Sequence, residues 1–347
     1  MSCMRMVPRP SGHSSRVEVL PIALDVEGGD NAPDVVIEGA RRARDELSVP
    51  IVMVGRAETL EKLTDFEVFE AAEVITMDED PASSVRSKRD SSLVRCAELV
   101  RDKKASAMIS AGNTGAAMAS ALLKMGRIKG VARPAIATTI PVPGSTPTVL
   151  LDSGANSECL PSWLVQFGQM GSIFAREAFD IANPMVGLMS IGEEKSKGNS
   201  LVKETHQLLD KVKGITFIGN VEGRDVMSDR VDVVVTDGFT GNVVLKTLEG
   251  GVRAVAKAVI GALQGGEDGP KVFELAFPKL MDLWSALDPD SYGGAMLLGV
   301  NGVCVISHGS SSANAIFHAI RTTSVLVNHD LVGKLSVGIA EASVDVS

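Results

Sequence analysis

From residue 19 onward, short apolar runs alternate with segments of helical periodicity, and this alternation restricts the fold more than any other feature of the chain. The order is typical of layered α/β proteins, in which helices cover the faces of a buried sheet. The apolar runs predict strands at 19–25, 51–54, 73–76, 107–109, 135–141, 148–152, 185–191, 215–219, 231–236 and 303–307. The periodic segments predict helices at 33–47, 91–103, 116–125, 161–179, 200–212 and 312–325, whereas the charged stretch 81–90 is predicted to be a loop.

Two details of this pattern refine the fold class. The runs at 135–141 and 148–152 are joined by Val-Pro-Gly-Ser-Thr-Pro, which predicts a chain reversal, so part of the sheet is expected to be antiparallel. Loops that contain Gly-Asn, at 110–115 and 237–242, each lie between an apolar run and a helix, which indicates two halves of related architecture. Because no stretch has the composition of a linker, residues 18–340 are expected to form a single α/β domain.

The composition excludes several classes of protein. A net charge of −9 argues against binding to nucleic acid through phosphate neutralisation, and no such partner is expected. The cysteines are scattered without metal-ligand spacing, which favours a reduced, cytoplasmic setting. Residues 1–17 are polar and lack the apolar segment of a signal peptide, so they are expected to be a disordered extension. The apolar window 293–306 is too short to span a bilayer.

The turn Ser110-Ala-Gly-Asn-Thr-Gly115 is the strongest candidate for a ligand site. Gly112 and Gly115 permit a close approach to the backbone, and the helix that follows would direct unpaired N–H groups at an anion. An ordinary connection between a strand and a helix explains the same residues, and both interpretations stay open. Similar donor-rich loops occur at 27–30, 152–156, 192–199, 237–242 and 308–311, and we expect them to gather at the carboxyl ends of strands.

Motifs of covalent, metal and nucleotide chemistry are missing from the sequence. There is no P-loop, GxSxG or HExxH motif, no Cys/His cluster and no GxGxxG spacing, so no metal or nicotinamide cofactor is expected. Cys159 and Ser310 have no partner base nearby in the sequence, and a buried thiol and a loop hydroxyl are the expected interpretations. Mechanisms based on positioning and charge stabilisation are therefore favoured.

Residues 253–284 form a separate pattern of two helices around a Gly/acidic break at 265–269. Apolar side chains recur at helical spacing, and cations occur on both segments. One interpretation is a core-facing or dimer-forming helical hairpin. The other is an interfacial element for a membrane or an acidic partner.

Taken in order, the loops resemble those of the PlsX-type phosphate acyltransferases over about residues 19–325. The matching stretches are 25–33 (DVEGGDNAP), 110–115 (SAGNTG), 126–130 (GRIKG), 170–172 (MGS), 192–194 (GEE), 197–199 (KGN), 219–225 (GNVEGRD), 237–246 (DGFTGNVVLK), 292–294 (YGG), 298–302 (LGVNG) and 308–311 (HGSS).

The resemblance implies that inorganic phosphate attacks the thioester of a long-chain acyl-[acyl carrier protein], giving acyl phosphate and free carrier protein for bacterial phospholipid synthesis. It implies a three-layer α/β/α fold with a mixed, mainly parallel sheet, like isocitrate and isopropylmalate dehydrogenases. It further implies a homodimer, peripheral attachment to the inner face of the membrane, and a glycerol-3-phosphate acyltransferase that uses the product. No cofactor is implied. It favours the interfacial interpretation of 253–284.

From this resemblance we hypothesise roles for individual residues. Phosphate would be held by Gly112, Asn113 and Thr114, with added contacts from Ser310 and Ser311. Lys197 would neutralise charge on phosphate or on the tetrahedral intermediate, and Asn242 would donate to the oxyanion. His308 would orient phosphate or protonate the thiolate, and a structural role in its turn is an equal alternative. The face for the carrier protein or membrane would comprise Arg253, Lys257, Lys271 and Lys279.

Two residues depart from the family pattern. Glu27 stands where the family usually has Met, so the first glycine loop is not expected to touch phosphate directly. Lys195 is an added cation near Lys197 that could share its role. Three rival functions remain: a phosphotransacetylase-like enzyme that uses coenzyme A thioesters, a dehydrogenase on the same fold, and a non-catalytic membrane scaffold.

Overall fold

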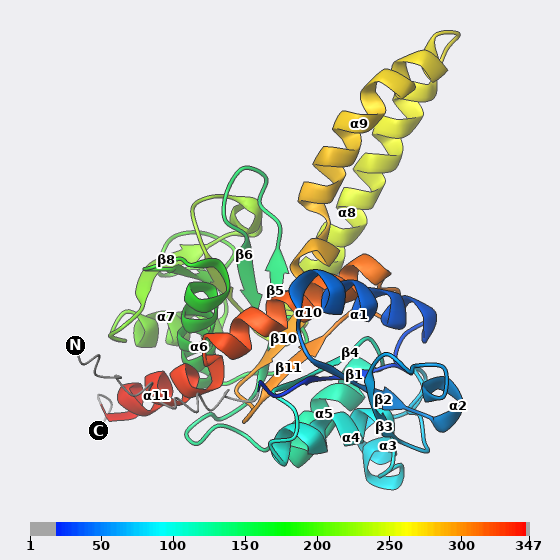
Figure 1. Cartoon of the computed structure of the whole chain (residues 1–347). Coiled ribbons are helices and arrows are strands. Elements are labelled where there is room, and N and C mark those ends of the chain that lie inside the picture. Colours follow the sequence, from blue (N-terminus) through cyan, green and yellow to red (C-terminus); the bar gives the residue numbers. More distant parts are fainter. Residues whose placement is uncertain (1–18, 345–347) are drawn as a thin grey trace, which may run out of the picture.

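A single eleven-stranded sheet runs through the computed structural model, which describes residues 19–344 (Figure 1). The predicted extension 1–17 lies outside the described residues. The strands follow the spatial order β3-β2-β1-β4-β11-β10-β5-β6-β9-β7-β8. They are β1 (Ile22–Asp25), β2 (Ile51–Gly55), β3 (Glu67–Glu70), β4 (Ala107–Ser110), β5 (Ala135–Ile140), β6 (Thr148–Leu151), β7 (Met185–Met189), β8 (Thr216–Val221), β9 (Val233–Val235), β10 (Ala295–Leu298) and β11 (Val303–Ile306).

Helices cover both faces of this sheet, which confirms the predicted three-layer α/β/α class (Figure 1). The α-helices are α1 (Asp34–Leu47), α2 (Ala57–Leu60), α3 (Pro81–Ser87), α4 (Ser92–Arg101), α5 (Thr114–Lys124), α6 (Pro161–Phe179), α7 (Ser200–Leu209), α8 (Gly238–Gln264), α9 (Gly269–Leu287), α10 (Ala313–Asn328) and α11 (Leu331–Val344). Two short 3₁₀ helices are η1 (Gly223–Met227) and η2 (Pro289–Tyr292).

Two sequence predictions about the segment 67–90 were wrong. The strand expected at 73–76 lies earlier in the chain, at β3, and Glu73 forms only an isolated bridge with Ser91. The expected loop 81–90 contains α3, which begins where the side chain of Asp80 accepts a hydrogen bond from the Ser83 N–H at 2.9 Å. A proline at the start of a helix and an aspartate cap are strong start signals. The many charged residues in this stretch nevertheless led to the prediction of a loop.

The two halves of the sheet run in opposite directions. Strands β3, β2, β1, β4 and β11 are mutually parallel, and so are β6, β9, β7 and β8. The antiparallel strands β10 and β5 join the two sets, which confirms the predicted reversal between β5 and β6. The carboxyl ends of the two sets therefore point toward opposite edges of the sheet.

The register of β5 nevertheless brings these carboxyl ends together. Its first half, Ala135–Ala137, pairs with β10, and its second half, Ala137–Ile140, pairs with β6. As a result, the last residue of β6 is level with Ala137, and the last residue of β11 is level with Thr138. The strands of the two halves thus end one residue apart, or about 3 Å along β5.

The hydrophobic cores are divided at the same place along β5. On one face of the sheet a single core extends under α1, α6, α10 and α11. On the other face there are two cores, one under α4 and α5 that includes Ile136, and one under α8 that includes Ile140. The half-buried Thr138 lies between them on β5. A gap between two cores, above the meeting point of the strand ends, is where a ligand can enter.

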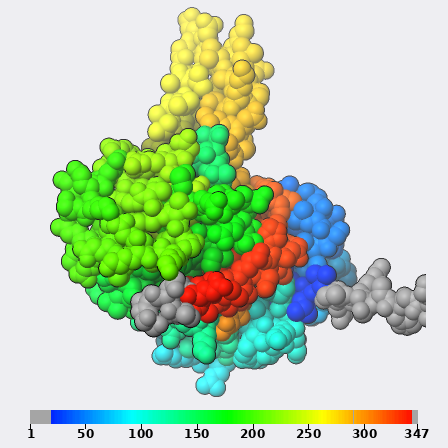
Figure 2. Space-filling model, turned by 90° about the vertical axis from the view of Figure 1, so that its left-hand side faces the viewer, coloured from blue at the N-terminus to red at the C-terminus, as the bar shows by residue number. Residues whose placement is uncertain are grey.

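Helices α8 and α9 project from the body as a long hairpin (Figures 1 and 2). The two helices pack against each other, and the break predicted at 265–269 lies at the turn between them. At the other end, the first turn of α8 packs closely on the segment that follows β6. A Cβ atom on Gly241 would overlap the backbone carbonyl oxygen of Asp152, whereas one on Gly250 would meet nothing within 4 Å.

These two glycines provide a matched test of the fold. Gly241→Ala is expected to lower the free energy of unfolding by about 1–3 kcal/mol, because α8 must move away from Asp152. Gly250→Ala is expected to raise it by up to about 1 kcal/mol, because alanine favours the helix. Urea denaturation measures both. Equal effects of the two substitutions would contradict the close contact at the start of α8.

Candidate functional site

A cleft of about 450 Å³ opens over Thr138, between the two cores. Its lining comes from both halves of the sheet: the start of α5 and the loop after β11 on one side, and Ser153 with α8 on the other. The sequence-predicted residues that line it are Thr114, Asn242, Arg253, His308, Ser310 and Ser311. Asp30, Met77 and Gly309 also line it, and a Cβ atom on Gly309 would meet the side chains of the other two.

Three of the predicted donor-rich loops pack together on the first side. The buried carboxylate of Asp25, at the end of β1, accepts a hydrogen bond from the Ser110 hydroxyl at 2.7 Å. Burial raises the pKa of Asp25, and the Ser110 hydrogen bond partly opposes this rise. The Asp30 N–H donates to the Gly309 carbonyl at 2.7 Å, which joins the loop after β1 to the loop after β11. A Cβ atom on Gly28 would clash with Asp25 and Ser110, so this packing requires glycine.

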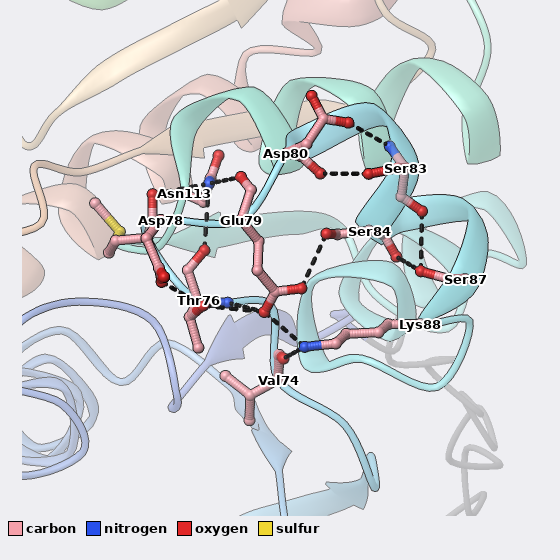
Figure 3. Close-up of polar contacts among 11 residues, drawn as sticks. Val74, Thr76, Asp78, Glu79, Asp80, Ser83, Ser84, Ser87, Lys88 and Asn113 are labelled. Atoms are coloured by element: carbon pink, nitrogen blue, oxygen red, sulfur yellow. Dashed lines mark hydrogen bonds and ion pairs between the residues drawn. The ribbon is translucent and has the colours of Figure 1, made fainter.

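The side chain of Asn113 is fully engaged in structural contacts (Figure 3). Its amide nitrogen donates to the carbonyls of Thr76, Met77 and Glu79 at 3.1–3.3 Å, and its oxygen accepts from the Ala116 N–H at 3.0 Å. Asn113 therefore caps α5 and holds the segment that brings Met77 to the cleft. Phosphate binding at this position, which stays a prediction, would use the backbone rather than the carboxamide.

Glu79 stabilises the same segment (Figure 3). Its carboxylate accepts hydrogen bonds from the Lys88 ammonium at 2.6 Å, the Thr76 N–H at 2.9 Å and the Ser84 hydroxyl at 2.9 Å. These bonds, that from Lys88 first, lower the pKa of Glu79 to about 2. Glu79 is therefore ionised throughout the physiological range, and its charge is matched by Lys88.

The start of α5 retains free donors. Gly112 donates its N–H to the Ser110 hydroxyl at 3.0 Å and does not line the cleft. Within the described residues, the N–H groups of Thr114 and Gly115 have no hydrogen-bond partner. Such groups at a helix N-terminus attract anions.

The loop after β11 supplies a histidine of defined tautomer and two buried hydroxyls. His308 Nδ1 is 2.8 Å from the Ser310 hydroxyl and accepts from the Ser310 N–H at 3.2 Å. Nδ1 is thus an acceptor, which leaves Nε2 as the donor in the neutral ring. Ser307 and Ser311 also line the cleft, and their hydroxyl oxygens are buried without a partner among the described residues. Buried hydroxyls without partners are uncommon, and here both belong to residues at the wall of an open site.

The loop after β6 forms the opposite side. The buried Asp152 carboxylate accepts N–H bonds from Ile136, Gly154, Ala155 and Asn156 at 2.7–3.1 Å. Burial raises the pKa of Asp152, and these bonds oppose the rise. The Ser153 hydroxyl lies 2.6 Å from that of Thr138. Asn242, exposed on the first turn of α8, lies beside Gly154, so its carboxamide is accessible from the cleft.

Lys197 is exposed on the loop after β7 and does not line the cleft. Strand β7 is two strands from β6, or about 10 Å. The loop is held by Asn220, which donates to the Glu194 carbonyl at 3.0 Å and contacts His206 at 2.9 Å. No partner of the Lys197 ammonium occurs in the described part of the chain, whereas Lys195 pairs with Asp210 at 2.6 Å.

Charged residues at the base of the hairpin form the remaining rim. Arg253, Glu249, Asp288 and Asp290 line the cleft there, while Lys257, Lys271 and Lys279 do not. Burial and the neighbouring Asp288 raise the pKa of Asp290, and the charges of His308 and Arg253 oppose this rise.

Several residues that line the cleft were not predicted from the sequence. The acidic pair Asp288 and Asp290 carried no motif, and Ser307 was treated as the end of a strand. Ser307 is distinguished only by a buried hydroxyl that has no partner in the part of the chain that the structure describes.

Two other sequence candidates have structural partners outside the cleft. The carboxylate of Glu27 pairs with Arg56 at 3.1 Å. Burial alone would raise the pKa of Glu27, but the hydrogen bonds and charge of Arg56 lower it. The half-buried Cys159 thiol donates to the Asn156 carbonyl at 3.5 Å, and burial raises its pKa to about 12. A thiol that stays protonated at neutral pH is a poor nucleophile.

Known proteins resemble this chain along most of its length. The family model described as "Fatty acid synthesis protein" matches residues 20–334. The phosphate acyltransferase of Elusimicrobium minutum (strain Pei191) is 47% identical over 329 residues, which cover 92% of this chain and 96% of the relative. That of Desulforudis audaxviator (strain MP104C) is 46% identical over 324 residues, with coverages of 92% and 96%.

Solved structures share the fold at low sequence identity. A phosphotransacetylase from Streptococcus pyogenes superposes with a TM-score of 0.60 at 18% identity, covering 89% of this chain and 94% of its own. A putative 4-hydroxythreonine-4-phosphate dehydrogenase from Salmonella typhimurium gives 0.54 at 12% identity, with coverages of 89% and 100%. The fold is thus common to phosphotransacylases and dehydrogenases, and the sequence match shows that the chain belongs to the phosphate acyltransferase family, as its loops predicted.

Proposed function

We propose that the chain transfers the acyl group of a long-chain acyl-[acyl carrier protein] to inorganic phosphate, as an enzyme of bacterial phospholipid synthesis. The observation that carries this proposal is the cleft at the junction of the half-sheets. The Thr114 N–H and the hydroxyls of Ser307 and Ser311 have no partner among the described residues, and their residues line the cleft together with the accessible Asn242. Donors for an anion on one side and for a carbonyl oxygen on the other suit phosphate attack on a thioester.

The chemistry follows from these donors. A phosphate oxygen held at the start of α5 attacks the thioester carbonyl carbon, the C–O bond forms, and the oxyanion accepts from Asn242. The C–S bond then breaks, and the thiolate of the carrier protein's prosthetic group leaves with the electron pair. We propose that Nε2–H of His308 orients phosphate by donating a hydrogen bond to it; giving a proton to the thiolate would require the imidazolium form of the ring. Asn113 and Ser310 keep their predicted phosphate-binding roles, and Lys197 keeps its predicted neutralising role, whereas the Gly112 N–H is already bonded to the Ser110 hydroxyl.

A phosphotransacetylase-like reaction of coenzyme A thioesters is the second candidate, because the fold resembles that of phosphotransacetylases. The deciding experiment measures acyl phosphate formed from phosphate and either the carrier-protein or the coenzyme A thioester, without added metal. The proposal requires the carrier-protein thioester to be the better substrate by kcat/KM. Formation of no acyl phosphate from either would favour a scaffold.

We further propose that residues 18–340 act as one catalytic unit and that 253–284 is its interfacial hairpin. The hairpin exposes large apolar side chains, including Val255, Leu275 and Leu283 at 50–74% exposure. Such a surface suits a homodimer contact or the inner face of a membrane, where a glycerol-3-phosphate acyltransferase would receive the product. No helix among the described residues is long and apolar enough to cross a bilayer.

Ser311 provides the first test of the phosphate site. Ser311→Ala is expected to leave thermal stability unchanged or slightly raised, because an unpartnered buried hydroxyl is removed. The KM for phosphate should rise about tenfold, as expected for one lost hydrogen bond to an ion. Ser120→Ala, at a buried and unpartnered hydroxyl on α5 outside the cleft, is the control. If both variants keep the wild-type KM, Ser311 does not bind phosphate.

Asn242 and Lys197 test the chemical step. Loss of one oxyanion or charge-neutralising donor typically reduces turnover about a hundred- to thousandfold. Asn242→Ala and Lys197→Ala are each expected to show this loss as folded proteins. Lys195→Ala should remain near wild type, because Lys195 is paired with Asp210 at the surface. Full activity in either of the first two variants removes that residue from the mechanism.

The cations of the hairpin test recognition of the acidic carrier protein. Reversing two of the four charges at Arg253, Lys257, Lys271 and Lys279 should raise the KM for the carrier-protein substrate and weaken its dependence on salt. Lys62→Glu, near the outer strand β3, is the control. An unchanged KM at low salt would reject this face.

A further inference from the structure

The cleft has two chemically different walls, and α8 contributes to both. Helical spacing places Asn242, Lys246, Glu249 and Arg253 in one polar row. Leu245, Leu248 and Val252 form an apolar row beside it. The proposed transfer chemistry uses Asn242, the first residue of the polar row. The apolar row has no role in that chemistry.

The apolar row faces apolar residues from the other side of the cleft. Ile140 at the end of β5, Pro141 after it and Met227 in η1 line the same space as Leu245 and Leu248. Ile140 belongs to the core beneath α8, and Met227, Leu245 and Leu248 pack against that core. These last three side chains are nevertheless only half-buried, because the cleft leaves one side of each open.

We propose that these five residues, Ile140, Pro141, Met227, Leu245 and Leu248, form an acyl groove that binds the hydrocarbon chain of the substrate. The inference rests on the proposed acyl transfer. Leu245 is three residues after Asn242, so it lies one helical turn, about 5 Å, along α8 from the proposed oxyanion donor. A thioester whose carbonyl oxygen is bound by Asn242 can therefore place its chain against Leu245 and then Leu248.

The groove suits an unbranched chain on energetic grounds. Each methylene removed from water contributes a factor of roughly four in binding. The preference for longer chains should therefore continue only as far as the groove does. Met227 is suited to the far wall, because its flexible thioether can pack against chains of different shape.

The test compares acyl-carrier-protein substrates with butyryl, octanoyl, dodecanoyl and hexadecanoyl chains. Wild-type kcat/KM should rise with chain length and then level off. Leu248→Trp should lower kcat/KM about ten- to two-hundredfold for the longer chains, and leave the butyryl substrate and the KM for phosphate within about twofold of wild type. Leu123→Trp, at a 54% exposed position near the end of α5 and outside both the cleft and the hairpin, is the matched control.

A binding measurement tests whether the groove binds the chain, independently of acyl transfer. Butyl, octyl, dodecyl and hexadecyl thioethers of pantetheine carry the chain but have no carbonyl group to attack, and calorimetry gives their Kd. Affinity that rises with length in wild type and loses this rise in Leu248→Trp supports the groove, even if no acyl phosphate forms and the proposed function fails. Met227→Trp repeats the test from the opposite wall should the first variant not fold.

Two results would overturn the groove. One is an equal loss of activity at every chain length in Leu248→Trp. The other is an unchanged length dependence of both kcat/KM and Kd in the folded tryptophan variants. If either result is found and the wild-type enzyme still forms acyl phosphate, the groove is wrong but the proposed function stands.

Discussion

The split pairing of β5 is the constraint on which the site depends. One strand of six residues pairs with β10 through its first half and with β6 through its second. In a fully parallel sheet, all carboxyl ends share one edge and ligands collect there. Here the two parallel sets run in opposite directions, and the stagger along β5 brings their carboxyl ends to nearly the same level. The cleft forms because each half contributes loops and a helix start to the same junction.

Buried polar groups stabilise this junction without entering the cleft. Asp25 joins the loops of the first half through Ser110, and Asp152 binds four backbone N–H groups of the second half. Burying a carboxylate is costly unless it is hydrogen-bonded, so each aspartate specifies the conformation of the loop around it. Donors left over from this packing, at the start of α5 and in the loop after β11, are available to a ligand.

Much of the fold was predictable because its signals are local. The buried strands have uninterrupted apolar runs, and α6 was placed at its observed bounds, 161–179, because a proline opens it. The segment 67–90 was mispredicted because β3 is an exposed edge strand with two glutamates, which gives no apolar run. The register of β5 could not be predicted, since pairing between strands far apart in sequence leaves no local pattern.

The candidate site was predictable only in part, for a related reason. Glycine, asparagine, serine and aspartate serve both helix caps and ligands, and Asn113, Asn199, Asp237 and Ser312 all cap helices here. Sequence alone could not separate the capping role of Asn113 from the accessible carboxamide of Asn242. Nor could it show that the Ser307 and Ser311 hydroxyls are buried without a partner in residues 19–344, because that depends on the packing of distant loops.

Whether both substrates meet at this junction can be seen in a crystal structure with phosphate and the dodecyl thioether of pantetheine. We expect phosphate between the start of α5 and the hydroxyls of Ser307 and Ser311, with the sulfur beside Asn242. Phosphate bound only at the Lys197 loop, with the sulfur outside the cleft, would contradict it.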